Sequence, residues 1–210
     1  MKLFHIQMTN IMGVEKLTKI LIFSLLLISC KKEFSPTEYK KWMESSDNGM
    51  YKTKEINNWV FTAQYETSEY LLLLNKGPEL IKDCDIQKEL DHYGETHSVL
   101  LNITDKKGNS PLKFNVRNEL EYNARIQYLN SEVTKDCFLL SGNDTLKCQF
   151  AHLERDFGIS PNLKINFAFD KAESDETIQF CFRDKLFNNG MIKFTFFKED
   201  FLNLPELRNK

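Results

Sequence analysis

The segment His152-Leu153-Glu154-Arg155-Asp156 places an imidazole close to two carboxylates. If this segment is a strand, His152 and Glu154 point to the same face, because side chains alternate along a strand. A histidine beside a carboxylate can act as a general base, so His152, Glu154 and Asp156 are candidate catalytic residues of a hydrolase. No Ser or Cys nucleophile motif and no His-Glu-x-x-His pair accompanies them. Structural ion pairs at a strand end are therefore the favoured interpretation.

Two further histidines stand in Asp91-His92 and Glu95-Thr96-His97, near the end of a predicted helix. Histidine is favoured at a helix C-terminus by the helix dipole, so we interpret His92 and His97 as capping residues. The chain has only four histidines, and its cysteines are scattered. The spacing of these residues matches no set of metal ligands, so we predict no metal and no cofactor.

The aromatic residues Trp42, Tyr51 and Trp59 could line a binding groove. Their spacing matches no base-stacking or ligand-stacking motif. Large aromatic side chains more often belong to a hydrophobic core, and we expect that role for them.

Cys137 and Cys148 flank the turn residues Gly142-Asn143. A two-residue hairpin loop at this turn places the cysteines directly opposite each other on adjacent strands. Opposite Cβ atoms lie about 4.5–5.5 Å apart, which is close to the range that a disulfide tolerates. The sequence leaves two alternatives, a Cys137–Cys148 disulfide or two buried thiols packed as small hydrophobic groups. Cys84 and Cys181 would form a second pair, but no local signal positions them.

The run Ile20–Leu27 is apolar except for Ser24, and Lys16 and Lys19 precede it. This arrangement is typical of a signal peptide. A helix that crosses a bilayer needs about 20 apolar residues, whereas lysines at 19 and 31 bound a much shorter run. The segment is therefore predicted to be an export signal and not a membrane span.

The residues Leu27-Ile28-Ser29-Cys30 resemble the lipobox of bacterial lipoproteins. The resemblance implies that the Cys30 thiol receives a diacylglycerol, that the chain is cut before Cys30, and that the new amine receives a further acyl chain such as palmitate. Two or three acyl chains would hold the protein stably at a membrane. The alternative is that Cys30 merely follows a hydrophobic leader.

The residue after the lipobox cysteine is Lys31, whereas lipoproteins retained in the inner membrane carry Asp there. The resemblance thus implies the cell outer membrane, with the periplasmic and surface leaflets both open. The leader and the Phe-, Lys- and Asn-rich composition also resemble uncharacterised lipoproteins of Bacteroidota. No functional family follows from this likeness.

Length and charge bound the rest of the chain. Residues 1–29 are the predicted signal peptide, residues 30–35 a lipidated tether, and residues 36–210 a single domain of ordinary size. The whole chain has 28 Lys and Arg against 30 Asp and Glu, a formal net charge of −2. Because neither sign dominates a long block, we predict that the protein does not bind nucleic acid.

Local signals predict both helices and strands. Ser35-Pro36-Thr37-Glu38 is a helix start, and the helix should run to about Glu44. Alternation predicts a strand over 58–66. A short helix capped by Thr67 or Ser68 should end at Gly77, and another should run from Pro78 to Gly94.

The second half of the chain is expected to be mainly β. Residues 99–103 and 112–116 are predicted to form a hairpin. The pattern of Asn118–Val133 fits either a helix or a strand, and we predict a helix because Asn118 can cap it. Residues 163–169, 178–182 and 192–196 read as strands of an antiparallel meander. The predicted fold is thus an α+β domain, an antiparallel sheet with helices on one face.

These observations favour a membrane-anchored lipoprotein of the bacterial cell envelope with a non-enzymatic binding or scaffold role. Its partners would be the membrane, through the N-terminal lipid, and a ligand or another envelope protein. The alternative is an envelope hydrolase that uses the residues around His152–Asp156. The absence of a catalytic motif leans toward binding without excluding an enzyme.

Overall fold

The structure is a computed structural model that describes residues 32–79, 81, 86–154, 161–171 and 177–208. The predicted signal peptide, Cys30 and Cys84 lie outside the described residues. Residues Glu33–Lys210 form one compact unit. The buried hydrophobic clusters described below are built from residues of this unit.

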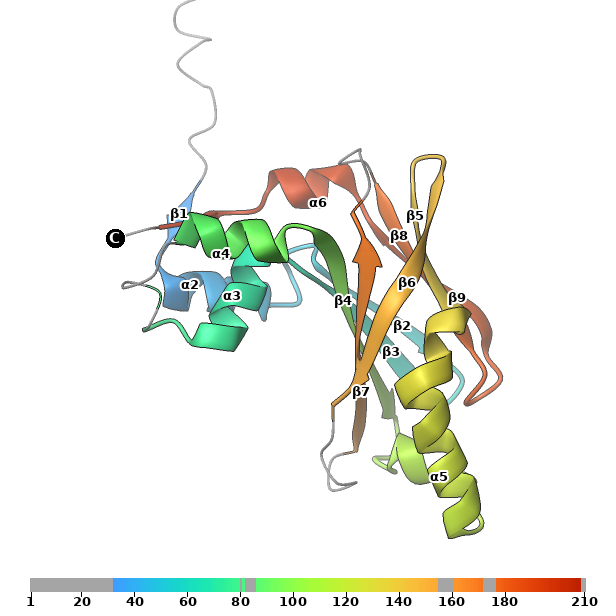
Figure 1. The fold of residues 1–210 in the computed structure, drawn as a ribbon. Helices are drawn as coiled ribbons and strands as arrows, with labels where there is room; N and C mark the ends of the chain where they lie inside the picture. The colour runs from blue at the N-terminus through green and yellow to red at the C-terminus, as the bar shows by residue number, and fades with distance from the viewer. Residues whose placement is uncertain (1–31, 80, 82–85, 155–160, 172–176, 209–210) are drawn as a thin grey trace, which may run out of the picture. The chain divides into compact units, whose positions relative to one another are not determined.

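The described residues form an eight-stranded sheet in which every pairing is antiparallel (Figure 1). The strand order is β2-β3-β4-β7-β6-β5-β8-β9. Together with the helices packed against it, this sheet confirms the predicted α+β class. The strands are β2 (Tyr51–Ile56), β3 (Trp59–Glu66), β4 (Thr96–Asp105), β5 (Cys137–Ser141), β6 (Asp144–Leu153), β7 (Asn162–Asp170), β8 (Ile178–Asp184) and β9 (Gly190–Phe196).

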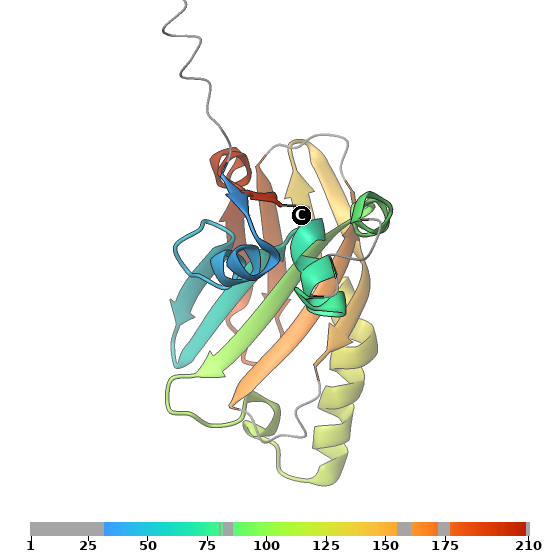
Figure 2. The ribbon, with the colours of Figure 1, turned by 90° about the vertical axis from the view of Figure 1, so that its left-hand side faces the viewer.

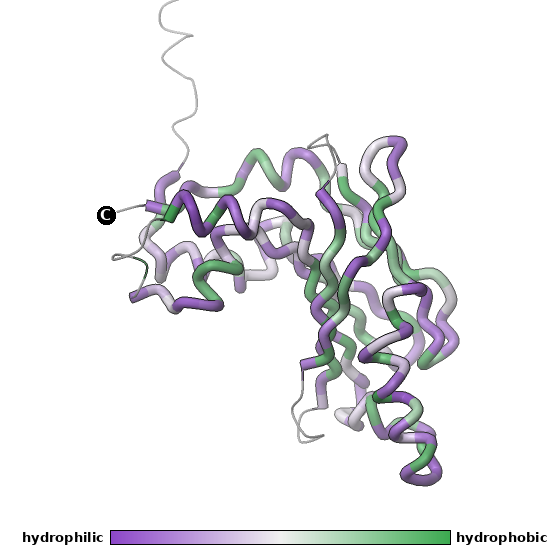
Figure 3. The backbone as a smooth tube through the Cα atoms, viewed as in Figure 1, coloured by the Kyte–Doolittle hydropathy of each residue, from purple (hydrophilic) through white to green (hydrophobic). Residues whose placement is uncertain are grey.

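Hydrophilic and hydrophobic residues alternate along most of these strands, so one sheet face is apolar (Figure 3). The sheet curls around this face, and the inward-facing apolar side chains of β3 to β9 form one cluster, here called the main core. Near the two sheet edges, Asn57 Nδ2 donates to Asn189 Oδ1 at 2.8 Å, and the Trp59 ring stacks on Phe187 at 3.6 Å. The fully buried aromatic members of the main core are Phe61, Phe167, Phe169, Phe180, Phe182, Phe194 and Phe196.

Three helices cover the outer face of the sheet beside β3 and β4 (Figures 1 and 2). They are α2 (Pro36–Met43), α3 (Ser68–Lys76) and α4 (Ile86–Tyr93). The predicted capping box at Ser35 and the predicted cap at Thr67 are both confirmed. The helices share a second buried cluster, here called the helical core, made of Tyr39, Met43, Met50, Tyr70, Leu72, Leu73, Ile81 and Ile86.

The helix predicted over 118–133 is also confirmed. It consists of α5 (Glu119–Gln127), capped by the Asn118 side chain, a π-helical turn η3 (Tyr128–Glu132) and a 3-10 turn η4 (Val133–Asp136). Leu129 and Val133 enter the main core from these turns, so this segment covers the lower end of the sheet in Figure 1.

The first and last described segments pair with each other. β1 (Glu33–Phe34) runs parallel to β10 (Glu206–Leu207), and Arg208 N donates to Phe34 O at 2.7 Å. The helix α6 (Lys198–Leu202) lies between β9 and β10 in the chain. Glu33 and Phe34, which the sequence assigned to a tether, are therefore part of the folded unit.

The predicted hairpin of residues 99–103 with 112–116 is wrong. Pro111–Lys113 forms a 3-10 turn, η2, and β4 instead pairs with β3 on one side and β7 on the other. Pro111 has no N–H to donate to a ladder, so a turn suits it better than a strand. Leu112 still reaches the main core, which explains the misleading apolar pattern.

Three smaller differences concern order and boundaries. The strand β2 has no clear alternation and was not predicted. Of the helix predicted from Pro78 to Gly94, α4 spans Ile86–Tyr93, whereas Pro78 and Glu79 form a turn. Strands β7, β8 and β9 are not one meander, because the β5–β6 hairpin lies between β7 and β8 in the sheet.

Candidate functional site

A cavity of about 770 Å³ opens at one end of the sheet, where β3, β4 and β8 meet α6. Five of the eleven described side chains that line it are apolar or aromatic, and six are polar or charged. The described residues that line it are Tyr65, Thr67, Ser68, Glu69, His97, Lys171, Ile178, Lys198, Phe201, Leu202 and Leu204. Cavities that combine apolar walls with convergent polar groups are the usual sites for small ligands.

The central polar contact of the cavity joins Tyr65 to His97. Both residues lie on the apolar face of their strands, because Tyr65 continues the alternation of Phe61 and Ala63, and His97 that of Val99. The Tyr65 hydroxyl and His97 Nδ1 are 2.7 Å apart, and His97 is almost fully buried. This hydrogen bond fixes the orientation of the imidazole at the edge of the main core.

The Tyr65 ring links the main core to α6. It lies 5.7 Å from the Phe196 ring and 5.0 Å, edge-on, from the Phe201 ring. Phe201 packs against both the main core and the helical core. The cavity therefore has one rigid aromatic wall that depends on the position of α6.

The start of α3 forms another part of the wall. Thr67 Oγ1 accepts a hydrogen bond from Tyr70 N at 3.2 Å and lies 2.9 Å from the Tyr39 hydroxyl. The Tyr39 hydroxyl also donates to Glu69 at 3.5 Å. Burial, with Glu69 adding to it, raises the pKa of Tyr39, so its hydroxyl remains a donor at neutral pH.

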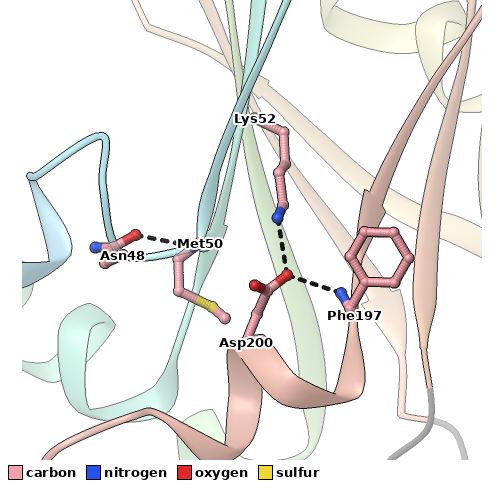
Figure 4. Close-up of polar contacts among 5 residues, drawn as sticks. All are labelled: Asn48, Met50, Lys52, Phe197 and Asp200. Atoms are coloured by element: carbon pink, nitrogen blue, oxygen red, sulfur yellow. Dashed lines mark hydrogen bonds and ion pairs between the residues drawn. The ribbon is translucent and has the colours of Figure 1, made fainter.

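The helix α6 is held in place by Asp200 (Figure 4). Asp200 Oδ2 accepts from Lys52 Nζ of β2 at 2.8 Å and from the backbone N–H of Phe197 at 2.8 Å. Gly49, just before β2, lies close to the Asp200 side chain. A Cβ added at Gly49 would be 2.3 Å from Asp200 Oδ1. The two sheet edges and α6 thus meet at one tight contact.

A second polar site lies on the outer face of the sheet, on β3 and β4. Ser98 Oγ donates to Glu66 Oε2 at 2.8 Å, and Glu66 is buried. Burial raises the pKa of the Glu66 carboxyl to about 7, and the charge of Glu154 contributes in the same direction. Sequence patterning did not single out Glu66, because its strand face reads as the polar one.

His152 lies on the outer face of β6, and Glu154 directly follows this strand. The Glu154 carboxylate accepts from Asn166 Nδ2 at 3.0 Å and is 3.6 Å from Lys164 Nζ. His152 is exposed, and its ring lies parallel to that of Phe150 at 6.4 Å. Neither residue lines the cavity described above, and Asp156 lies outside the described residues, so the hydrolase remains a prediction.

The other candidates separate in the structure. His92 is in the last turn of α4, as expected, but His97 is part of β4, so its assignment as a helix cap is wrong. Trp59 is buried in the main core, Trp42 packs on the helical core, and Tyr51 lies on the edge strand β2. These aromatic side chains do not form one groove.

The β5–β6 hairpin has the predicted two-residue loop, since Ser141 pairs with Asp144 and Phe138 with Lys147. The next two residues along this register are Cys137 and Cys148, and both are thiols in the structure, as is Cys181. Cys137 Sγ donates to Thr134 O at 3.7 Å, and Cys148 Sγ donates to Phe150 O at 3.1 Å. The interaction of the two neighbouring cysteines lowers the pKa of Cys148 and raises that of Cys137. The register is confirmed, and the disulfide itself stays a prediction.

The described part of the chain contains neither a metal-binding cluster nor a membrane-spanning helix. Within residues 32–208, apart from the gaps given above, no group of three or more His, Cys, Asp or Glu side chains is placed to hold a metal ion. Among the same residues, no helix has the length and apolar character needed to cross a membrane.

No protein-family model, no curated protein and no solved structure matches this chain.

Proposed function

We propose that this protein is a lipid-anchored, non-enzymatic binding protein of the bacterial cell envelope, and that the cavity beside Tyr65 and His97 is its ligand site. The cavity is the observation that carries the proposal. Its volume of about 770 Å³ falls within the range of about 300–1,000 Å³ that is typical of small-molecule sites.

The arrangement of polar groups supports binding. The hydroxyl of Tyr65 and the imidazole of His97 orient each other through their hydrogen bond, and rigid strands carry both. Thr67 and Glu69 are likewise held by Tyr39. A wall of mutually fixed side chains recognises a ligand at low entropic cost, because few groups need to be ordered on binding.

The sequence supports the envelope location. Leu27-Ile28-Ser29-Cys30 resembles a lipobox, and Lys31 follows it, which favours the outer membrane. Only Lys31 and Lys32 separate Cys30 from β1. A lipid on Cys30 would therefore keep the folded unit close to the membrane surface, where it could meet a ligand or another envelope protein.

The anchor is tested by expressing the full chain in a bacterium that processes lipoproteins and by measuring the mass of its N-terminal peptide. We expect a triacylated or diacylated Cys30 and incorporation of labelled palmitate, with both lost in Cys30→Ser and both kept in Cys148→Ser. Membrane fractionation and protease accessibility then distinguish the outer membrane and its leaflet. An unmodified Cys30 with the leader still attached would contradict the anchor.

The site is tested with Nile red, a neutral apolar dye whose fluorescence rises in an apolar cavity. Ser68→Trp places a large ring at the cavity wall, and Ser131→Trp places the same ring on the exposed end of η3. We expect the wild type and Ser131→Trp to bind the dye and Ser68→Trp to lose most of the binding. Equal binding by both variants would show that the cavity is not the site.

A further inference from the structure

The cavity has a distinctly apolar side. Phe201, Leu202 and Leu204 come from α6 and the segment after it, and Ile178 comes from the start of β8. Leu202 is 63% exposed although it lines the cavity, so its side chain stands at the mouth. An exposed leucine in such a place gains from contact with an apolar ligand, at about 25 cal/mol per Å² of buried apolar area.

Among the described residues that line the cavity, lysines outnumber carboxylates. Lys171 follows β7 and Lys198 begins α6, and both are exposed, whereas Glu69 is the one carboxylate among the described lining residues. No ion pair within the described part of the chain involves either lysine. Lys52, by contrast, is neutralised by Asp200. The two mouth lysines are therefore available to a negatively charged group.

The polar groups deeper in the cavity are already engaged. Tyr65 and His97 bond to each other, and the Thr67 hydroxyl is bonded to Tyr39 and Tyr70. An alkyl chain lying along Phe201 and Ile178 would therefore leave these groups with their present partners. A ligand with charge at the mouth and hydrocarbon inside matches this distribution.

We infer that the cavity binds an amphiphile with an anionic head, a carboxylate or a phosphate ester on an alkyl chain, with the head at Lys171 and Lys198 and the chain against Phe201 and Leu202. This inference deepens the proposed function and rests on it. The two lysines at the mouth select an anionic head group by electrostatic attraction. Burial of the alkyl chain against the apolar wall supplies most of the affinity. The amphiphile can come from a bilayer or from solution, and the experiment separates these sources.

The test uses residues 31–210, because both buried clusters lie within the compact unit Glu33–Lys210. Isothermal titration compares dodecyl phosphate, dodecanoate, neutral dodecyl maltoside and inorganic phosphate, all below micelle formation. We expect both anionic amphiphiles to bind at least about tenfold more tightly than the neutral one, and inorganic phosphate not to bind. Their affinity should fall as the salt concentration rises, since exposed charges are screened.

Matched variants locate the head and the chain. Lys171→Glu combined with Lys198→Glu should weaken the binding of dodecyl phosphate by at least about tenfold and leave the binding of dodecyl maltoside unchanged. Lys113→Glu combined with Lys135→Glu, on the turns η2 and η4, should have no effect. Leu202→Gln should weaken the binding of every dodecyl probe. Leu120→Gln, at an exposed position of α5, should weaken the binding of none.

The outcomes distinguish the inference from the function on which it rests. If dodecyl maltoside binds as tightly as dodecyl phosphate and the lysine reversal changes nothing, the anionic head is wrong while the cavity remains a ligand site. If no dodecyl probe and no Nile red binds, both proposals fail. If dodecyl phosphate binds, incubation with phosphatidylcholine vesicles that contain a monoacyl glycerol phosphate identifies the source. Transfer of that lipid to the protein indicates the bilayer, and its absence indicates soluble amphiphiles.

Discussion

The Asp200 carboxylate lies 2.8 Å from the Lys52 ammonium, and this contact ties α6 to β2. The strand β2 is one edge of the sheet, and α6 follows β9, which is the other edge. The two side chains are only 18% and 25% exposed, so water screens the pair less than it would at an open surface. The same helix carries Phe201 and Leu202, so the ion pair also positions one wall of the cavity.

A double-mutant cycle of Lys52→Met and Asp200→Asn should give a coupling free energy of about 1 kcal/mol, because the pair is partly buried and well aligned. Urea unfolding of the wild type, the two single variants and the double variant measures it. The same cycle on Lys40 and Glu44, an exposed pair within α2 and its C-cap, is the control and should give about half as much or less. Strictly additive effects at Lys52 and Asp200 would contradict the proposed link.

Gly49→Ala should destabilise the protein more than an ordinary glycine substitution. Gly49 has a φ of +80°, and an added Cβ would lie 2.3 Å from Asp200 Oδ1. Gly108→Ala is a matched control, because Gly108 has a φ of +76° and nothing within 4 Å of the added Cβ. We expect Gly108→Ala to cost about 1 kcal/mol from backbone strain, and Gly49→Ala to cost roughly 1–3 kcal/mol more from the overlap. Equal urea unfolding midpoints for Gly49→Ala and Gly108→Ala would show that the side chain of Asp200 can move aside at no cost.

Glu66 predicts a specific pH dependence of stability. Burial raises its pKa in the folded state to about 7, from a usual value of 4.5, so between these pH values the folded protein binds more protons at this site than the unfolded chain. The contribution of Glu66 to stability is therefore retained below pH 4.5 and lost as the pH rises through about 7. The full loss is about 3 kcal/mol, at about 1.4 kcal/mol for each unit of pKa shift.

Glu66→Gln should remove this dependence while it keeps an oxygen that accepts from Ser98. The free energy of unfolding of this variant, measured between pH 4.5 and pH 8, should fall less than that of the wild type. Glu132→Gln, at an exposed position of η3, should follow the wild-type curve. Parallel curves for all three proteins would mean that Glu66 titrates at its ordinary value.

The cysteine pair predicts an order of reactivity. The neighbouring Cys137 thiol lowers the pKa of Cys148, whereas Cys137 and Cys181 have raised pKa values. Because the thiolate is the nucleophile, iodoacetamide should modify Cys148 first. Peptide mass spectrometry after brief labelling measures this order. Faster labelling of Cys181 would contradict it.

The same pair should form the Cys137–Cys148 disulfide when oxidised glutathione is added. The Cys148 thiolate attacks a glutathione sulfur, and Cys137 then displaces the second glutathione, so the two cysteines lose two hydrogens and each oxidised glutathione yields two reduced molecules. Intact mass should fall by two hydrogen atoms in the wild type and in Cys181→Ser, and Cys148→Ser should not change in this way. Retention of both thiols under these conditions would leave the alternative of a purely packed pair.

Local signals in the sequence determined the elements that depend on neighbouring residues. The cap at Ser35, the strand from Trp59 to Glu66 and the register of the β5–β6 hairpin all follow from groups a few residues apart. In these places the hydrogen-bond partner or the turn chemistry is contained within the segment itself.

The order of strands and the cavity were decided only by the tertiary structure. β4 pairs with β7 and not with the nearby apolar segment around Leu112, and His97 meets Tyr65 because β3 and β4 pair through residues far apart in the chain. The alternation of residues along a strand shows which of its faces is apolar. It does not show which strands will pair, because the apolar faces of different strands are chemically alike. The choice among them is made by how all the faces pack together around one core, and that choice brings Tyr65, His97 and α6 to the same cavity.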